Sequence, residues 1–224
     1  MKTFLTFFIF LTLGCASTPK AHADTPYLPC TLDSGRQELR SKELATLVKS
    51  DQDDREDWQK KSPSEFGEVT KRDLIRRKRV GEIFGEGCFR TAADYGAAAL
   101  VYQHGDVPDH YFQTFIWAKR AVELGDVTQT SLIAKAIDRY LINIGQKQLF
   151  GTQADRPGPT EATCWCLAQI ESSFPEKIRK QYRAKTRTEV FVWLKELNQG
   201  KTCPNTECTK SLKPSPKGTI PGFW

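Results

Sequence analysis

Residues 103–153 hold the side chains with the clearest potential for chemistry. His104 is one of three histidines in the sequence, and Asp138 and Arg139 follow it on a strongly periodic segment. In a folded pocket, His104 would carry a proton, Asp138 would orient it or act as a general base, and Arg139 would bind an anion. Further hydrogen bonds for binding would come from Gln103, Gln148, Gly151, Thr152 and Gln153.

The same residues also have a structural interpretation, which we favour. Asp138 and Arg139 lie away from the apolar side of their segment, and the tight stretch 146–153 follows closely enough to fold over them. They would then satisfy the backbone of that loop, because buried polar groups need hydrogen-bond partners. The sequence supplies no activated nucleophile, since Ser131 lacks a Gly-x-Ser-x-Gly setting. We therefore lean against an enzyme.

No pattern in the sequence predicts a metal or a cofactor. His104 and His110 are six residues apart, on either side of a predicted turn. Asp51 and Asp53 faintly resemble a calcium loop, but Glu56 stands where an EF-hand needs glycine. We therefore expect the acidic stretch around Asp51 to form a polar helix face.

Hydrophobic periodicity predicts an all-α fold, a small bundle of about five helices with a loop-rich C-terminal extension. Helix-start signals precede three of the helices: Thr91 with Asp94, Asp109 alone, and Asp126 with Gln129. The predicted helices cover residues 34–50, 69–84, 92–102, 108–124, 127–144 and 175–198.

The sequence divides into five segments. We expect a signal peptide over residues 1–23, a linker over 24–33, a helical domain over 34–153, a loop plus a C-terminal helix over 154–200, and a Pro-rich tail over 201–224. Phe223 and Trp224 could tuck into a groove or bind a partner, and we favour tucking or disorder. Hydrophobic residues make up 39% of the chain and charged residues 27%, a balance that argues against wholesale disorder.

The N-terminus indicates export. Lys2 precedes an apolar run at residues 4–13 that is too short to span a bilayer stably. We favour a lipoprotein signal cleaved before Cys15, which would tether the protein to a membrane by a lipid anchor. Ala16 follows that cysteine, and this implies outer-membrane sorting in a Gram-negative host. An Ala-x-Ala site at residues 21–23 offers the alternative of a soluble periplasmic or secreted protein.

The remaining cysteines agree with an oxidising compartment. Six follow Cys15, an even number that suggests up to three disulfides. A zinc site is disfavoured because the Cys-x-Cys spacing is tighter than that of an ordinary zinc knuckle. We expect Cys164 and Cys166 to be tied to the segment with Cys203 and Cys208, which leaves Cys30 to pair with Cys88.

The central segment resembles two kinds of protein. Tyr102, Gly105, Trp117, Ala121 and Gly125 give it the spacing of one helical hairpin related to tetratricopeptide repeats, but no second repeat follows. It is more similar to an uncharacterised bacterial family with an Asp-Gln-x-x-Arg element and Gln-His-Gly, Asp-Arg and Gly-x-x-Gln-x-x-Gly-Thr-Gln motifs. Those motifs correspond here to Asp51, Gln52, Arg55, Gln103, His104, Gly105, Asp138, Arg139, Gly145, Gln148, Gly151, Thr152 and Gln153. The resemblance covers residues 50–153 and implies a mostly helical domain of unknown function.

The charge distribution leaves two function hypotheses. Residues 170–224 contain eleven Lys or Arg and five Asp or Glu, which accounts for the net charge of +6. A mildly basic face is usually solvated, and no nucleic-acid-binding motif accompanies it, so we expect no nucleic-acid partner. We favour a lipid-anchored helical interaction or scaffold module of the cell envelope with a protein partner. The alternative is an envelope hydrolase or small-ligand binder built on His104, Asp138, Arg139 and Gln153.

Overall fold

The computed structural model describes residues 30–57, 61–156 and 164–224, and the predicted leader and Cys15 lie outside this part. The all-α fold with five helices in its central domain is confirmed. These are α1 (Ser34–Asp53), α2 (Pro63–Gly85), α3 (Ala92–Tyr102), α4 (Pro108–Glu123) and α5 (Thr130–Asn143), with a short 3-10 helix, η2 (Val127–Gln129), before α5. The extension adds β1 (Ala154–Asp155), β2 (Cys166–Leu167), α6 (Glu176–Gln181) and α7 (Arg187–Leu197).

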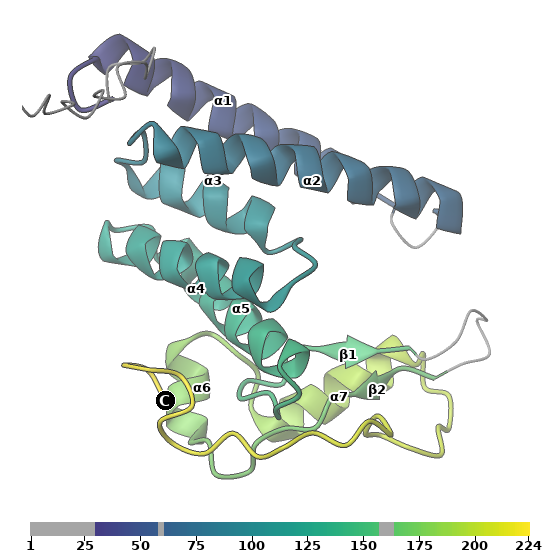
Figure 1. Ribbon diagram of the computed structural model, residues 1–224. Coiled ribbons are helices and arrows are strands. Elements are labelled where there is room, and N and C mark those ends of the chain that lie inside the picture. Colours follow the sequence, from purple (N-terminus) through teal and green to yellow (C-terminus); the bar gives the residue numbers. More distant parts are fainter. Residues whose placement is uncertain (1–29, 58–60, 157–163) are drawn as a thin grey trace, which may run out of the picture.

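The elements are arranged in tiers (Figure 1). The helices α1 and α2 form one tier, α3 lies next to them, α4 and α5 follow, and the C-terminal elements close the other end. The strands β1 and β2 pair antiparallel, with Ala154 opposite Leu167. No helix in the described ranges is long and apolar enough to cross a membrane.

Capping residues set where the helices begin. The capping box of Thr91 and Asp94 opens α3 as predicted. A second capping box, Ser62 with Glu65, starts α2 six residues before the predicted position 69. The prediction for Asp109 is wrong: Val107 is the N-cap of α4, and its apolar side chain makes no capping hydrogen bond. The proline that follows it has a φ already suited to the first helical position.

Small residues let α3 occupy the centre of the domain. Gly96, Ala98 and Ala99 are buried on this helix, so α1 and α4 approach it closely. At Gly96 the neighbour is the side chain of Gln129 from η2, because a Cβ atom there would lie 3.1 Å from its Nε2. We therefore expect little tolerance for a larger side chain at position 96.

One large apolar core joins the helical domain to the C-terminal extension. It includes Leu44 of α1, Ile83 of α2 and Ile137 of α5 together with Phe150, Phe174 and Ile220 from later segments. A smaller core within the extension contains Leu167, Ile170, Val190 and Leu194. The extension is thus packed onto the helices over a shared interior.

Three disulfides are present in the described segments, and they confirm the predicted Cys30–Cys88 bond and the predicted link between the two later cysteine segments. Cys30 is bonded to Cys88, Cys164 to Cys203, and Cys166 to Cys208. The first ties the start of α1 to the turn between α2 and α3. The other two attach the segment around β2 to the tail.

Residues 175–198 form two helices instead of the single helix predicted. Arg183 has a left-handed backbone conformation with φ of 55°, which stops the first helix from continuing beyond Tyr182. Thr186 then opens α7 with a capping box to Glu189. The periodic apolar pattern alone could not reveal this break, because a left-handed residue changes the backbone and leaves the spacing of apolar residues unchanged.

The tail ends in a tucked conformation, one of the two outcomes that we favoured. The ring of Phe223 lies 5.0 Å from Tyr182 and 5.8 Å from Phe115, measured between centroids. Trp224 packs against Phe174 and donates its indole N–H to the carbonyl of Ser215 at 2.8 Å.

Candidate functional site

The turn Gln103–Gly105, at the end of α3, is a junction between helices. The last carbonyl groups of an α-helix have no partner inside the helix. Here three consecutive carbonyls accept hydrogen bonds from side chains of three other helices: Gln103 from Arg139 of α5, His104 from Arg77 of α2 at 2.9 Å, and Gly105 from Tyr111 of α4 at 2.6 Å. The turn therefore holds α2, α4 and α5 against the end of α3.

The imidazole of His104 adds α1 to this junction. Its Nδ1 lies 3.0 Å from Oδ2 of Asp51, a carboxylate that is fully buried. A carboxylate only accepts, so Nδ1 carries the proton and Nε2 keeps a lone pair when the ring is neutral. The carboxylate bonded to His104 is thus Asp51, and not Asp138 as we had hypothesised.

Asp51 belongs to an ion-pair network between α1 and α2. Arg55 lies 3.0 Å from Asp51 and 2.9 Å from Asp73. Arg76 in turn lies 2.6 Å from Asp73 and 2.7 Å from Asp54. The expected polar helix face holds for the exposed Gln52 and Asp53 but not for Asp51. Asp51 is buried because α2 packs over the end of α1, and Arg55 with the arginines of α2 neutralises the carboxylates there.

Asp138 holds the loop that follows α5. One carboxylate oxygen accepts from the backbone N–H groups of Leu149 and Phe150 at 2.8 and 2.9 Å. The other accepts from the backbone N–H and the hydroxyl of Thr152, both at 2.8 Å. Burial raises the pKa of Asp138, whereas these four donors act in the opposite direction. All the acceptor capacity seen for this carboxylate serves the loop.

Gln148 and Gly151 complete the same loop. The amide of Gln148 donates to the carbonyls of Gln153 and Ala168 at 3.0 and 2.6 Å, and its oxygen accepts from Gln153 N–H at 2.9 Å. Gly151 has φ of 76°, and a Cβ there would lie 2.9 Å from Ile170, so only glycine fits. The long sequence motif at 145–153 thus encodes a loop conformation.

Arg139 connects this loop to the Gln103–Gly105 turn. Its Nε donates to Oε1 of Gln153 at 3.1 Å, while its Nη1 donates to the carbonyl of Gln103. Among the described residues, no carboxylate forms an ion pair with it. Burial lowers the pKa of this guanidinium, with a further contribution from the positive charge of Arg55.

His104 is neutral near pH 7 in this setting. Burial is the main cause that lowers its pKa, and the charges of Arg55 and Arg139 lower it further, while Asp51 acts in the opposite direction. The ring keeps partial contact with solvent, with 19% of its side chain exposed.

The motif residues, spread over about a hundred positions, thus meet in two adjacent places. Asp51, Arg55, His104 and Arg139 surround the turn, while Asp138, Gln148, Gly151 and Thr152 build the loop, and Gln153 touches both through Arg139. Gln52 is exposed and bonds to Asp51 at 2.7 Å, and Gly145 ends α5 with φ of 78°. The structure does not bring Asp138 into hydrogen-bond contact with His104.

Sequence reasoning missed three contributors, Asp73, Arg77 and Tyr111. Asp73 and Arg77 lie in a highly charged stretch of α2, residues 71–79. The sequence alone does not show which of these charged side chains face the interior. The spacing of Asp73 and Arg77 from the buried Val69 and Val80 places them on the inward side of the helix, a signal that could have been used. Tyr111 lies among apolar residues of its helix, a pattern that gives no sign of the hydrogen bond its hydroxyl donates to Gly105.

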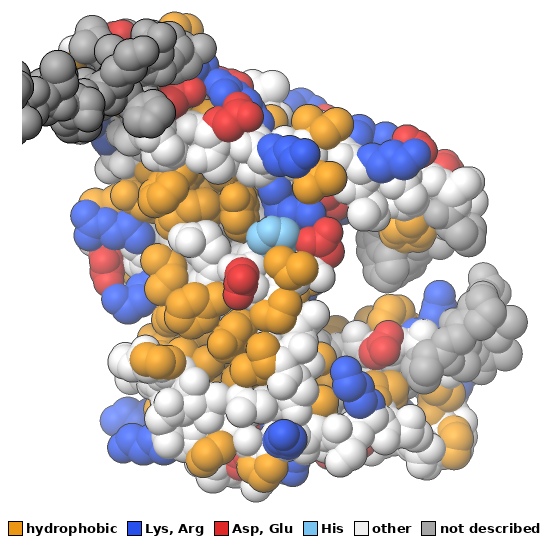
Figure 2. All heavy atoms as spheres, in the orientation of Figure 1, with side chains coloured by type: hydrophobic (Ala, Val, Ile, Leu, Met, Phe, Trp, Pro, Cys, Tyr) orange, Lys and Arg blue, Asp and Glu red, His pale blue; other side chains and the backbone are white. Residues whose placement is uncertain are grey.

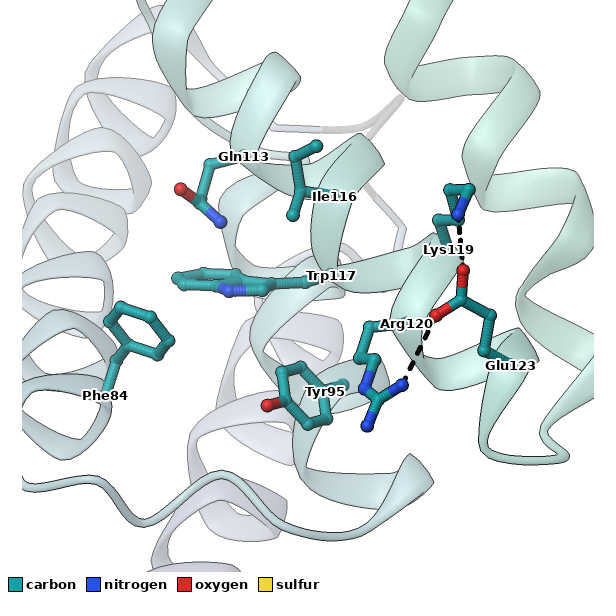
Figure 3. Close-up of a pocket in the computed structure, with 8 residues that line it drawn as sticks. All are labelled: Phe84, Tyr95, Gln113, Ile116, Trp117, Lys119, Arg120 and Glu123. Carbon is teal, nitrogen blue, oxygen red and sulfur yellow. Dashed lines mark hydrogen bonds and ion pairs between the residues drawn. The ribbon is translucent and has the colours of Figure 1, made fainter. Parts of the chain in front are cut away.

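A separate pocket lies on the outer side of α3 and α4 (Figure 3). It has a volume of about 500 Å³ and is bordered by Phe84 of α2, Tyr95 of α3 and Trp117 of α4. Trp117 is buried in an aromatic cluster, with ring centroids 5.3 Å from Phe84 and 5.2 Å from Phe89. The rest of the lining comes from α4: Gln113, Ile116, Lys119, Arg120 and Glu123.

The described ranges contain one three-residue group with metal-ligand atoms close together, Cys30, Glu86 and Cys88. Both cysteines are joined in a disulfide, so they have no thiolate to offer a metal. Comparisons with family models, with curated proteins and with solved structures yield no match for this chain.

Proposed function

We propose that the chain is an exported bacterial envelope protein whose helical domain acts as an interaction or scaffold module. Export is supported by the apolar leader in the sequence and by the three disulfides, which persist in oxidising compartments. We further propose lipid attachment at Cys15, which would place the protein on the outer membrane of a Gram-negative cell. Cleavage after Ala23 would instead release it to the periplasm or the exterior.

We also propose that the chain is related to the uncharacterised bacterial family with the Gln-His-Gly and Gly-Thr-Gln motifs. The support is that residues matching its motifs, from Asp51 to Gln153, lie around one turn and one loop. Most of their hydrogen bonds go to backbone groups. A scaffold role follows more naturally from this use than catalysis does.

The pocket at Trp117, which we call the aromatic pocket, carries the proposal of a partner site. Its border includes two exposed apolar side chains, Phe84 and Ile116, with 48% and 42% of their surface exposed. Hydrophobic side chains gather over the tiers of α3 to α5, and charged ones are more frequent over α1 and α2 (Figure 2). Exposed apolar groups around a concave surface mark interaction sites more often than isolated ones do.

The charges at the aromatic pocket define the expected partner. Lys119 and Arg120 both pair with Glu123, which leaves one positive charge in excess at the rim. We therefore expect a protein segment that inserts an apolar or aromatic side chain and places a carboxylate beside these cations. The aromatic rings of the pocket can pack edge-to-face against an inserted aromatic side chain.

Site-specific photo-crosslinking in intact cells tests the partner site. A photoreactive amino acid at position 116 is expected to give one discrete protein adduct. The same group at Ile144, an equally exposed apolar residue with 41% of its surface exposed, is expected to give none. Phe84→Ser should abolish the adduct while the chain stays folded, with at most a modest fall in melting temperature from the lost contacts with Phe89 and Trp117. Equal adducts at both positions, or an adduct that survives Phe84→Ser, would contradict the proposal.

A further inference from the structure

Arg139 and His104 each keep one polar atom that the fold does not use. We propose that Arg139 and His104 form a binding site for a small oxyanion, a carboxylate or a phosphate group. This site lies at the Gln103–Gly105 turn and is independent of the aromatic pocket and of the partner proposed for it.

The guanidinium of Arg139 is fixed in place for such a ligand. Nη1 is bonded to the carbonyl of Gln103 and Nε to the side chain of Gln153. Nη2 has no hydrogen-bond partner in the described part of the chain, yet it is not a buried atom. Two anchored nitrogens hold the third in one direction, so little conformational entropy is lost when an anion binds.

The local charge balance leaves Arg139 without a counter-ion. Around His104, three carboxylates face three arginines in the ion-pair network: Asp51, Asp54 and Asp73 with Arg55, Arg72 and Arg76. On the α2 and α4 side, Arg77 is paired with Asp106, which also contacts His110. Arg139 therefore contributes one unmatched positive charge in a largely desolvated place. Such a charge is costly without an anion, and a ligand would supply it.

His104 supplies the second contact and couples binding to protons. Its Nδ1 is engaged with Asp51, and its Nε2 has no hydrogen-bond partner among the residues the structure describes. Because Arg139 is bonded to the residue immediately before His104, the two side chains lie beside the same turn. A neutral Nε2 accepts a proton from an acidic ligand, and the resulting imidazolium donates to the bound anion.

Carboxylate and phosphate share this recognition chemistry, since both present two oxygens to one guanidinium edge. They differ in the hydroxyl that monohydrogen phosphate offers to Nε2. The charged groups that affect the pKa of the ring are Asp51 and Arg55 from the α1 end and Arg139 from α5. Arg77, paired with Asp106, donates to the backbone carbonyl of His104 and not to its ring. An added anion raises the pKa of His104, because it favours the charged imidazole.

A histidine titration by nuclear magnetic resonance tests the proposal. The ring signals of His104 and His110 are followed against pH in sodium chloride, in inorganic phosphate and in acetate at equal ionic strength. We expect the pKa of His104 to rise by about one unit in at least one of the two anions. That of His110 should stay unchanged. A response to phosphate alone assigns a phosphate group, and a response to acetate alone assigns a carboxylate.

Two variants separate the site from general salt effects. Arg139→Gln keeps a donor for Gln103 but removes the charge, and it should abolish the rise. Arg120→Gln, an exposed arginine paired with Glu123, should leave it intact. Should Arg139→Gln fail to fold, Arg139→Lys replaces it and should reduce the rise, because a lysine lacks the fixed second edge. A pKa of His104 that ignores both anions, or one that rises equally in the Arg139 and Arg120 variants, overturns the proposal.

Discussion

At the scale of single residues, burial and partners decide what Asp138 and His104 do. Asp138 is fully buried, and both of its oxygens accept backbone hydrogen bonds from the loop. His104 is bonded through one nitrogen and leaves the other toward solvent. The carboxylate of Asp138 therefore stabilises the loop, whereas Nε2 of His104 is available to bind a ligand.

Replacing Asp138 by asparagine should destabilise the protein strongly. The amide nitrogen of the introduced side chain would face N–H donors, so at least one buried donor would lose its acceptor. We expect a loss of about 2–4 kcal/mol in the free energy of unfolding, measured by urea denaturation. The exposed Asp109, which makes no cap hydrogen bond, provides the matched control, and Asp109→Asn should change stability little. Equal losses in the two variants would remove the structural role assigned to Asp138.

His104 should make the stability of the protein depend on pH in mildly acidic solution. Its pKa is lower in the folded chain than in the unfolded chain, so the unfolded state binds more protons below about pH 6.5. The contribution of neutral His104 is complete above that pH and is lost as the pH falls through the folded pKa. His104→Gln should therefore flatten the curve of unfolding free energy against pH in this range. His110→Asn is the comparison variant. The pKa of His110 is also lowered by burial, so the pH dependence that this variant removes must be distinguished from that of His104. An unchanged slope in His104→Gln would contradict this assignment.

At the scale of elements, the break between α6 and α7 depends on local chemistry at Thr186. Its hydroxyl accepts from the N–H of Glu189, whose carboxylate accepts from the N–H of Thr186 at 2.7 Å. Thr186→Ala should cost about 1 kcal/mol and increase hydrogen exchange in the first turn of α7. Thr188→Ala, two residues later and exposed within the helix, should be neutral or stabilising, because alanine is the better helix former. If both variants lose the same stability, the cap does not define the start of α7.

Helix identity could be predicted from the sequence much better than the contacts between helices. The Thr91–Asp94 box and the periodic apolar residues of α5 carry their information locally. The pairing of Asp51 with His104 spans 53 residues, and no local pattern fixes which helix faces lie together. From the sequence alone, Asp51 is therefore indistinguishable from the exposed members of a polar helix face. The break at Arg183 was missed for a related reason, since a positive φ at a non-glycine residue leaves no trace in hydrophobic periodicity.

At the scale of the whole molecule, the C-terminal extension closes the core. Phe150 stands at the centre of this closure, with ring centroids 4.9 Å from Phe174 and 6.0 Å from Phe223. The backbone adds bridges that join Gln146 to Lys213 and Gln148 to Ile170. The loop that carries the Gly-Thr-Gln motif is therefore clamped from one side by Asp138 and from the other by the extension.

Removing the ring of Phe223 tests how far stability depends on this closure. Phe223 contacts Phe115 of α4, Phe150 of the loop and Tyr182 after α6, so its loss would leave a gap where three segments meet. We expect Phe223→Ala to lower the free energy of unfolding by about 2 kcal/mol and to speed proteolysis of the tail. The variant keeps the disulfides of the tail but loses the ring contacts that pack its end against the core. Phe191→Ala on α7 is the matched control, since that ring is 38% exposed and forms no ring pair with a described residue. Tail proteolysis that is equally fast in the two variants would show that the disulfides at Cys203 and Cys208 hold the tail without help from Phe223.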